Sequence, residues 1–388
     1  MRILLLAPYD LFPPVHGGSS LVYSFVRHAS RRHDVTALIS HLYSQGGPID
    51  LASERLHVEY CPPSPFDRLR VLSFVVNPHY YRAAEQLFGR SRPQVVHCET
   101  LWTVLAGRSL HRKHGLPLVW VAENIEARKF AEIGYAKPVV GLLRLIERVA
   151  CQCADHIIVL SRPDRQGLID LYGAPPDKIT VITPGPDLED FFFDEASRSD
   201  VRKRYGLRST DALLTFVGNL QYLPNQQAVR RISQVIYPAV SERYPSARFV
   251  IIGQRPELLS DFRRENIVFT GYLSRQDLIA HLCATDVFLV PVETGSGIRM
   301  KIPEATACGR VVVATRQAAA GLEMFEDDEI LRVQAAGADF VAAVLQVIED
   351  PDLRDAIGRR ARVRTQQEFG WERTLAAYEQ VYAKVGAL

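Results

Sequence analysis

The most informative part of this chain reads Pro291-Val292-Glu293-Thr294-Gly295-Ser296-Gly297-Ile298-Arg299-Met300-Lys301-Ile302-Pro303-Glu304-Ala305-Thr306-Ala307-Cys308-Gly309. The run that leads into it, Asp286–Pro291, is apolar and β-branched, which is typical of a buried parallel strand that ends at a proline. The segment therefore predicts a glycine-rich loop at the carboxyl end of a strand, followed by a helix.

The glycine-rich loop has the features of an anion site. Gly295 and Gly297 let the backbone approach a ligand closely, and Ser296 is predicted to cap the following helix. The free amide groups and the dipole of that helix would then face a bound anion. Pyrophosphate is the expected ligand.

Three charged side chains follow the loop. Lys301 and Glu304 are three residues apart and should share a helix face, with Arg299 just before them. A carboxylate repels phosphate but accepts hydrogen bonds from a ribose diol, while the two cations neutralise phosphates. The combination favours a nucleotide diphosphate; the alternative is an exposed helix pair beside turn glycines, worth a few tenths of a kcal/mol.

Length and composition bound the class of protein. A chain of 388 residues predicts two domains, and a net charge of +2 without a long basic run argues against nucleic acid as a partner. The opening apolar run, residues 3–8, is too short for a signal peptide and stops at a proline, so a cytoplasmic location is expected.

The cysteines predict neither disulfides nor a metal site. They are scattered, mostly in apolar segments, and Cys151 and Cys153 are the only close pair. On the helix expected there, residues two apart point to nearly opposite sides and cannot share a zinc ion. Reduced core thiols are expected.

Buried strands alternate with helical stretches along both halves of the chain, which predicts two doubly wound α/β domains with parallel sheets. The predicted boundaries are 1–190 for the first domain, 200–370 for the second, and 371–388 for a terminal amphipathic helix. The predicted strands are Arg2–Ala7, Val35–Ser40, Val95–His97, Leu118–Val121, His156–Leu160, Leu213–Gly218, Phe249–Gly253, Ile267–Gly271, Asp286–Val290 and Val311–Ala314. Ligands of such sheets bind at the carboxyl ends of the strands, so we expect facing domains to enclose a cleft.

Motifs in both halves resemble a known family, the retaining GT-B glycosyltransferases of family four (glycosyl transferases group 1). The resemblance covers nearly the whole chain. It rests on Pro14-Val15-His16-Gly17-Gly18, Val95-Val96-His97, Glu123-Asn124-Ile125-Glu126, Thr183-Pro184-Gly185-Pro186-Asp187, Phe216-Val217-Gly218-Asn219, Ile251-Ile252-Gly253, Thr270-Gly271-Tyr272-Leu273 and the Gly295–Gly309 unit.

The resemblance implies transfer of a sugar from a nucleoside diphosphate sugar to an acceptor hydroxyl, without a metal or other cofactor. It implies that Glu304 binds the nucleotide ribose, and that the terminal helix returns to the first domain. The implied donor-binding set is Gly17, Gly18, Gly218, Asn219, Asn225, Gly253, Tyr272, Leu273, Glu293, Gly295, Ser296, Gly297, Ile298 and Glu304. The implied catalytic set is Arg299, Lys301, His97 and Glu99, and the acceptor contacts are Asn124 and Glu126.

The chain departs from the family pattern in three places. Ser296 stands where the family commonly has a first glutamate, and Glu293 is a candidate to replace it. The usual arginine and lysine are missing from 219–227, which leaves the phosphates to Arg299 and Lys301. Glu99 stands where a histidine is often found, and His97 is either a wall of the sugar site or a satisfied core histidine.

The acceptor is expected to be a glycan, a lipid-linked sugar or a small-molecule hydroxyl. Its site is expected around 66–81, 99–103 and 128–148. The first of these contains a segment, Arg68–Val76, that is either a peripheral membrane contact or an ordinary buried segment with an arginine rim. Two other functions stay open: a sugar-nucleotide epimerase, and a catalytically silent nucleotide-sugar binder that partners an active transferase.

Overall fold

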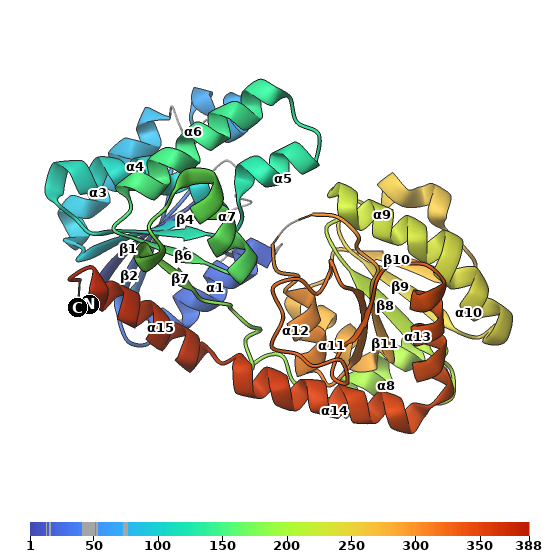
Figure 1. Ribbon diagram of the computed structural model, residues 1–388. Coiled ribbons are helices and arrows are strands. Elements are labelled where there is room, and N and C mark those ends of the chain that lie inside the picture. The colour runs from blue at the N-terminus through green and yellow to red at the C-terminus, as the bar shows by residue number, and fades with distance from the viewer. Residues whose placement is uncertain are drawn as a thin grey trace. The chain divides into compact units, whose positions relative to one another are not determined.

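The computed structural model describes residues 1–12, 14, 17–40, 51, 53–72, 77–295 and 297–387, and gives only the backbone of residues 69–72. The chain forms two compact units (Figure 1). Unit 1 comprises Met1–Pro184 and Trp371–Leu388, and unit 2 comprises Gly185–Gly370. The division falls before position 190, where the sequence had predicted the first domain to end.

Unit 1 is built on a seven-stranded parallel sheet in the order β3-β2-β1-β4-β5-β6-β7. Its central strands are buried on both faces, because helices cover each side of the sheet. The strands are β1 Arg2–Ala7, β2 Asp34–Ile39, β3 Leu56–Tyr60, β4 Val95–Glu99, β5 Leu118–Ala122, β6 His156–Val159 and β7 Ile179–Val181. The helices are α1 Gly17–Ala29, α3 Pro78–Ser91, α4 Thr100–His114, α5 Glu126–Glu132, α6 Lys137–Cys153, α7 Arg162–Tyr172 and α15 Trp371–Lys384, with 3₁₀ turns η2 Pro65–Leu72 and η3 Pro176–Lys178.

Unit 2 is built on a six-stranded parallel sheet in the order β10-β9-β8-β11-β12-β13. The strands are β8 Leu213–Val217, β9 Arg248–Ile252, β10 Ile267–Gly271, β11 Val287–Val290, β12 Val311–Thr315 and β13 Leu331–Val333. The helices are α8 Glu195–Arg204, α9 Leu223–Arg231, α10 Tyr237–Arg243, α11 Arg275–Ala284, α12 Lys301–Ala307, α13 Ala338–Glu349 and α14 Pro351–Glu368, with a π turn η4 Ile232–Ile236 and a 3₁₀ turn η5 Pro256–Phe262.

In each sheet the strand order reverses once, between β1 and β4 in unit 1 and between β8 and β11 in unit 2. Loops that leave the carboxyl ends of the strands on either side of such a switch point diverge, and ligands of doubly wound folds bind there. The chain therefore has two doubly wound units, as the sequence predicted, and each unit has one switch point at which a ligand could bind.

The terminal helix α15 belongs to unit 1, where it packs beside α1. Its buried face carries Trp371, Leu375, Tyr378, Val381 and Tyr382. The spacing of four, three, three and one residues places these side chains along one stripe of the helix. The terminal segment is thus a full part of the unit 1 core.

Two further predictions concern the cysteines and membrane contact. All six cysteines are free thiols, and five of them are buried. Among the described residues, no helix has the length and apolar content needed to span a membrane. Most of Arg68–Val76, the segment considered for membrane contact, lies outside the described side chains.

Candidate functional site

The glycine-rich loop of unit 2 follows β11 at the switch point of the second sheet. Gly295 and Gly297 have φ values of 92° and 81°, a region that favours glycine. A methyl group at Gly295 would also come within 2.6 Å of the Tyr222 hydroxyl. Both glycines are therefore required by the backbone path; Ser296 lies outside the described residues.

Arg299 holds this loop in shape. Its guanidinium donates hydrogen bonds to the carbonyl oxygens of Gly297 at 2.9 Å, Thr294 at 3.0 Å and Gly295 at 3.1 Å. Gln317 donates a further bond to the Gly295 carbonyl at 3.0 Å. The predicted role of Arg299 toward phosphate stays a prediction, and the observed role is to organise the loop around Ile298.

The helix after the loop begins later than the sequence predicted. α12 starts at Lys301, its N-cap position is Met300, and no side chain among the described residues caps it. Residues 297–300 precede the helix, and the predicted cap residue, Ser296, lies outside the described residues. Glu304 consequently lies in the first turn of α12.

Lys301 and Glu304 form a close pair at this helix start. The Lys301 Nζ atom lies 2.6 Å from Glu304 Oε2, as the spacing predicted. Glu304 is only 3% exposed, so the pair is not the exposed helix pair of the alternative interpretation. The Glu304 carboxylate is thus buried inside unit 2 beside the ammonium group of Lys301. Burying charged groups costs free energy, and a contact with a ligand would explain this arrangement.

The neighbouring strand ends contribute further donor-site candidates. Gly218 follows β8 and Gly253 follows β9, and a methyl group at Gly253 would overlap the carbonyl oxygen of Gly218. The Asn225 side chain closes the loop by donating to the Asn219 carbonyl at 2.9 Å. These loops meet at the same edge as the glycine-rich loop because β8 and β11 are adjacent.

Glu293, Tyr272 and Leu273 complete the predicted set on unit 2. Glu293 accepts a hydrogen bond from the amide of Ala336 at 2.9 Å and lies 3.4 Å from an Arg231 nitrogen. Its carboxylate is thus engaged in this structure. Tyr272 and Leu273 follow the end of β10, farther along the same edge, and Tyr272 is 45% exposed.

In unit 1, His97 and Glu99 lie on β4 beside the switch point and are completely buried. His97 Nε2 is 2.8 Å from Glu99 Oε1, and His97 Nδ1 is 2.6 Å from the Tyr382 hydroxyl. With both ring nitrogens engaged, His97 is a core residue that positions Glu99 and anchors α15.

One carboxylate oxygen of Glu99 is not engaged by the described residues. Its Oε2 atom is buried and accepts no hydrogen bond from any residue that the structure describes. The next residue, Thr100, has a φ of 62°, which is unusual for a β-branched side chain. An orphaned carboxylate oxygen next to a strained backbone is the combination found at binding sites.

Two more carboxylates gather near Glu99. Glu123 follows β5 and accepts a hydrogen bond from the Tyr9 hydroxyl, which follows β1. Burial, followed by repulsion from Glu99, raises the pKa of Glu123 to about 8. Glu126 is 3% exposed, has Lys129 as an ion-pair partner at 3.4 Å, and has one oxygen that accepts no bond from the described residues.

We name Tyr9, Glu99, Glu123 and Glu126 the carboxylate cluster. Asn124, another predicted acceptor contact, lies in the turn between two of its members and is partly exposed. Gly18, at the start of α1, sits so close that a methyl group there would lie 2.6 Å from Glu123 Oε2, whereas Gly17 has open space around it. The sequence did not assign Tyr9 or Glu123 to a site; their positions just after buried strands were the signal that could have found them.

Comparison with known proteins accounts for both units. A family model described as Glycosyltransferase Family 4 matches residues 15–190, and one described as Glycosyl transferases group 1 matches residues 211–350. The chain is 31% identical over 259 residues to a D-inositol 3-phosphate glycosyltransferase of Kineococcus radiotolerans. That alignment covers 61% of this chain and 59% of the relative, so the chain spans about three fifths of that relative's length.

Solved structures agree over the whole chain. Sucrose-phosphate synthase from Thermosynechococcus elongatus superposes with a TM-score of 0.82 at 17% identity, covering 100% of both chains. HepE of Anabaena, in complex with UDP-glucose, gives a TM-score of 0.74 at 15% identity, again covering 100% of both. At this level of identity the likeness establishes the fold, which is GT-B. From the two family models, one on each unit, it follows that the chain belongs to the family-four glycosyltransferases (glycosyl transferases group 1).

Proposed function

We propose that the protein transfers a glycosyl group from a nucleoside diphosphate sugar to a hydroxyl group of an acceptor. The observation that carries this is the buried Glu304 carboxylate, 2.6 Å from Lys301 and directly after a glycine-rich loop at a switch point. A ribose diol would donate to Glu304, and Lys301 would attract the diphosphate. The complex of HepE with UDP-glucose supports this donor class.

The acceptor would bind on unit 1 at the carboxylate cluster. Two of its oxygens, on Glu99 and Glu126, are buried and accept no hydrogen bond from the described residues. Such oxygens need donors, and the hydroxyl groups of a sugar or cyclitol supply them. Because the Kineococcus relative is a D-inositol 3-phosphate glycosyltransferase, inositol phosphate is the first acceptor to test.

We propose a retaining reaction that needs no metal. The bond from the anomeric carbon to the leaving phosphate breaks, the acceptor oxygen bonds to that carbon on the same face, and its proton passes to the departing phosphate. Lys301, together with Arg299 if the loop rearranges around the ligand, stabilises the charge that develops on the diphosphate. An anomeric proton NMR spectrum that shows inversion would overturn retention, and loss of activity in EDTA would overturn metal independence.

The donor site is tested by Glu304→Gln. The substitution keeps the volume but replaces one ribose-binding oxygen and removes the charge, so we expect nucleoside diphosphate affinity to fall roughly 10- to 100-fold. Calorimetry with a panel of nucleoside diphosphates and nucleotide sugars measures this, followed by an assay of slow donor hydrolysis. Glu349→Gln changes a half-exposed carboxylate of the same unit and should bind as the parent does.

The outcomes separate the candidate functions. Selective binding that weakens in Glu304→Gln, with donor hydrolysis or transfer, supports the transferase. Binding without any turnover would favour a silent nucleotide-sugar binder, an alternative motivated by the glutamate that Ser296 replaces. Acceptor-independent conversion of the donor sugar would favour an epimerase, and equal binding by both variants would remove Glu304 from the donor site.

A further inference from the structure

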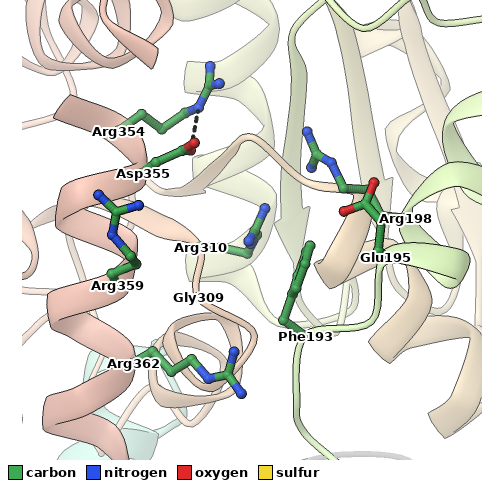
Figure 2. Close-up of a pocket in the computed structure, with 9 residues that line it drawn as sticks. All are labelled: Phe193, Glu195, Arg198, Gly309, Arg310, Arg354, Asp355, Arg359 and Arg362. Carbon is green, nitrogen blue, oxygen red and sulfur yellow. Dashed lines mark ion pairs between the residues drawn. The ribbon is translucent and has the colours of Figure 1, made fainter. Parts of the chain in front are cut away.

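Unit 2 contains a second hollow, away from the glycine-rich loop, with a volume of about 300 Å³. We name it the arginine pocket. Figure 2 shows Arg310 between helix α14 and the segment that begins α8. The pocket is lined by Phe193, Glu195, Arg198, Gly309, Arg310, Arg354, Asp355, Arg359 and Arg362.

The pocket lies at the opposite edge of the sheet from the candidate donor site. Arg310 immediately precedes β12 and donates to the carbonyl of Thr285, just before β11. These are the amino ends of the strands, whereas the glycine-rich loop follows the carboxyl end of β11. Strands of four or five residues separate the two edges by roughly 15 Å.

Close packing of two glycines shapes the wall on the α14 side. A methyl group at Gly358 would overlap the carbonyl oxygen of Gly309, so α14 can approach the end of α12 only with glycine there. Gly309 has a φ of 70°, which also favours glycine. Arg354 and Arg362, one turn on either side of Gly358, line the same pocket as Arg310, as does Arg359 next to that glycine.

Two of the five arginines are already neutralised. Arg198 forms an ion pair of 2.8 Å with Asp286 and donates to three backbone carbonyls. Arg354 lies 3.6 Å from Asp355. These two arginines can be explained by the fold alone.

The other three arginines have no carboxylate partner among the described residues. Arg310 is fixed by hydrogen bonds to the carbonyls of Cys308 at 2.9 Å and Thr285 at 3.2 Å, and its guanidinium lies 4.6 Å from the Phe193 ring centre. Arg359 and Arg362 form neither a hydrogen bond nor an ion pair with the described part of the chain. Burial, followed by the neighbouring Arg198 charge, lowers the pKa of Arg310.

Other arginines on α14 behave differently. Arg360 lies 3.0 Å from Asp328, and Arg364 lies 3.1 Å from Glu329, on a different face of the helix. Both arginines of α14 that lack a carboxylate partner in the described part of the chain, Arg359 and Arg362, line the pocket, together with the carboxylates Asp355 and Glu195. Guanidinium groups without such a partner in a hollow indicate a missing anion.

We propose that the arginine pocket binds a small phosphorylated anion, at a site separate from the donor site. Guanidinium groups donate paired hydrogen bonds to phosphoryl oxygens, and the Phe193 ring offers an apolar wall to an organic remainder. The volume of about 300 Å³ admits a sugar phosphate or a pyrophosphate group. The ligand is either a free metabolite or the phosphate headgroup of a lipid.

The pocket is tested by titrating the full chain with pyrophosphate in a calorimeter. Each lost arginine should weaken binding roughly 10-fold, so Arg359→Gln combined with Arg362→Gln should weaken it roughly 100-fold. Arg360→Gln combined with Arg364→Gln removes the same charge from the other face and should change affinity little. Because all variants keep the donor site, pyrophosphate bound there contributes equally to each, and nucleoside diphosphate binding should be unchanged.

A gain of affinity provides a test that misfolding cannot imitate. Asp355→Asn removes a carboxylate from the pocket and releases Arg354, so pyrophosphate should bind several-fold more tightly. Hydrogen–deuterium exchange should show ligand-dependent protection of residues 354–362, and the double variant at 359 and 362 should lose it. Equal affinities in both double variants, no gain with Asp355→Asn, or no protection of this segment would each overturn the proposal.

The two sources of phosphate are separated by a sedimentation assay. Vesicles of phosphatidylcholine containing phosphatidic acid that pull down the parent chain, but not the variant at 359 and 362, identify a lipid headgroup. Pyrophosphate binding without vesicle binding identifies a free metabolite. Absence of both would overturn the site while leaving the Glu304 test of the donor site unaffected.

Discussion

At the scale of single residues, Gly253, a member of the proposed donor set, is a position where one added methyl group would meet the backbone. It follows β9, and a Cβ atom there would overlap the backbone carbonyl of Gly218, which cannot rotate away as a side chain could. We expect Gly253→Ala to destabilise unit 2 by about 1–3 kcal/mol and to weaken nucleoside diphosphate binding. Circular dichroism melts and calorimetry measure the two effects.

A matched glycine isolates the steric cause. Gly337 lies in the same unit, has a φ of −117°, and has open space where a Cβ would go. Gly337→Ala should therefore be neutral in both measurements. If the two substitutions had the same effect, the close approach of the β8 and β9 loops would not be what requires glycine.

At the scale of elements, α15 is tied to unit 1 by one buried hydrogen bond as well as by its apolar stripe. The Tyr382 hydroxyl lies 2.6 Å from His97 Nδ1. Tyr382→Phe leaves that buried nitrogen without its partner, so we expect a loss of about 1–3 kcal/mol. Tyr378→Phe, one turn earlier, removes a hydroxyl that forms no hydrogen bond with the described residues, so it should lower the free energy of unfolding less. A larger loss of stability in Tyr378→Phe than in Tyr382→Phe would contradict the role of His97.

Urea unfolding, monitored by tryptophan fluorescence, measures this loss of stability in unit 1. The chain has three tryptophans, Trp102, Trp120 and Trp371, and all belong to unit 1. The fluorescence change therefore reports unit 1 without contribution from unit 2.

The elements also show how far sequence reasoning extends. The central strand β1 was predicted with its observed bounds, because burial on both faces leaves a continuous apolar run. The edge strand β10 was also predicted with its observed bounds, although it is only partly buried. The strands β3, β7 and β13 were missed because each is short, lies at a sheet edge and is only partly buried. An edge strand in which polar and apolar residues alternate, such as β3, is hard to separate from a loop, whereas the apolar run at the start of β10 marked that edge strand.

The candidate site divides in the same way. Lys301 and Glu304 were paired correctly from their spacing, since local helix geometry fixes which side chains meet. Glu123 was not assigned a role, because its proximity to Tyr9 and Glu99 follows from the order of β1, β4 and β5 in the sheet. Sheet order is a long-range property that one sequence does not display.

At the scale of the whole molecule, the carboxylate cluster should make unit 1 sensitive to pH. The folded unit keeps a proton on Glu123 up to about pH 8, and burial raises the pKa of Glu147 to about 7. In the unfolded chain both carboxyl groups ionise near pH 4.3. Folding therefore takes up protons above that pH, and the stability of unit 1 falls as pH rises.

The window from about pH 7.5 to 8.5 isolates this effect. His33 and His156 have pKa values lowered mainly by burial in the folded state, and histidines of the unfolded chain titrate near pH 6.5, so both are largely neutral in the folded and unfolded states above about pH 7.5. We expect the melting temperature seen by tryptophan fluorescence to fall by a few degrees across this window.

Glu123→Gln keeps an oxygen that accepts the Tyr9 hydrogen bond and has no proton to lose, so its melting temperature should fall less. Glu132→Gln, on the exposed side of α5, should follow the parent slope. Parallel slopes for the parent and Glu123→Gln would show that Glu123 is ionised in the folded unit, which would overturn its role in the pH dependence.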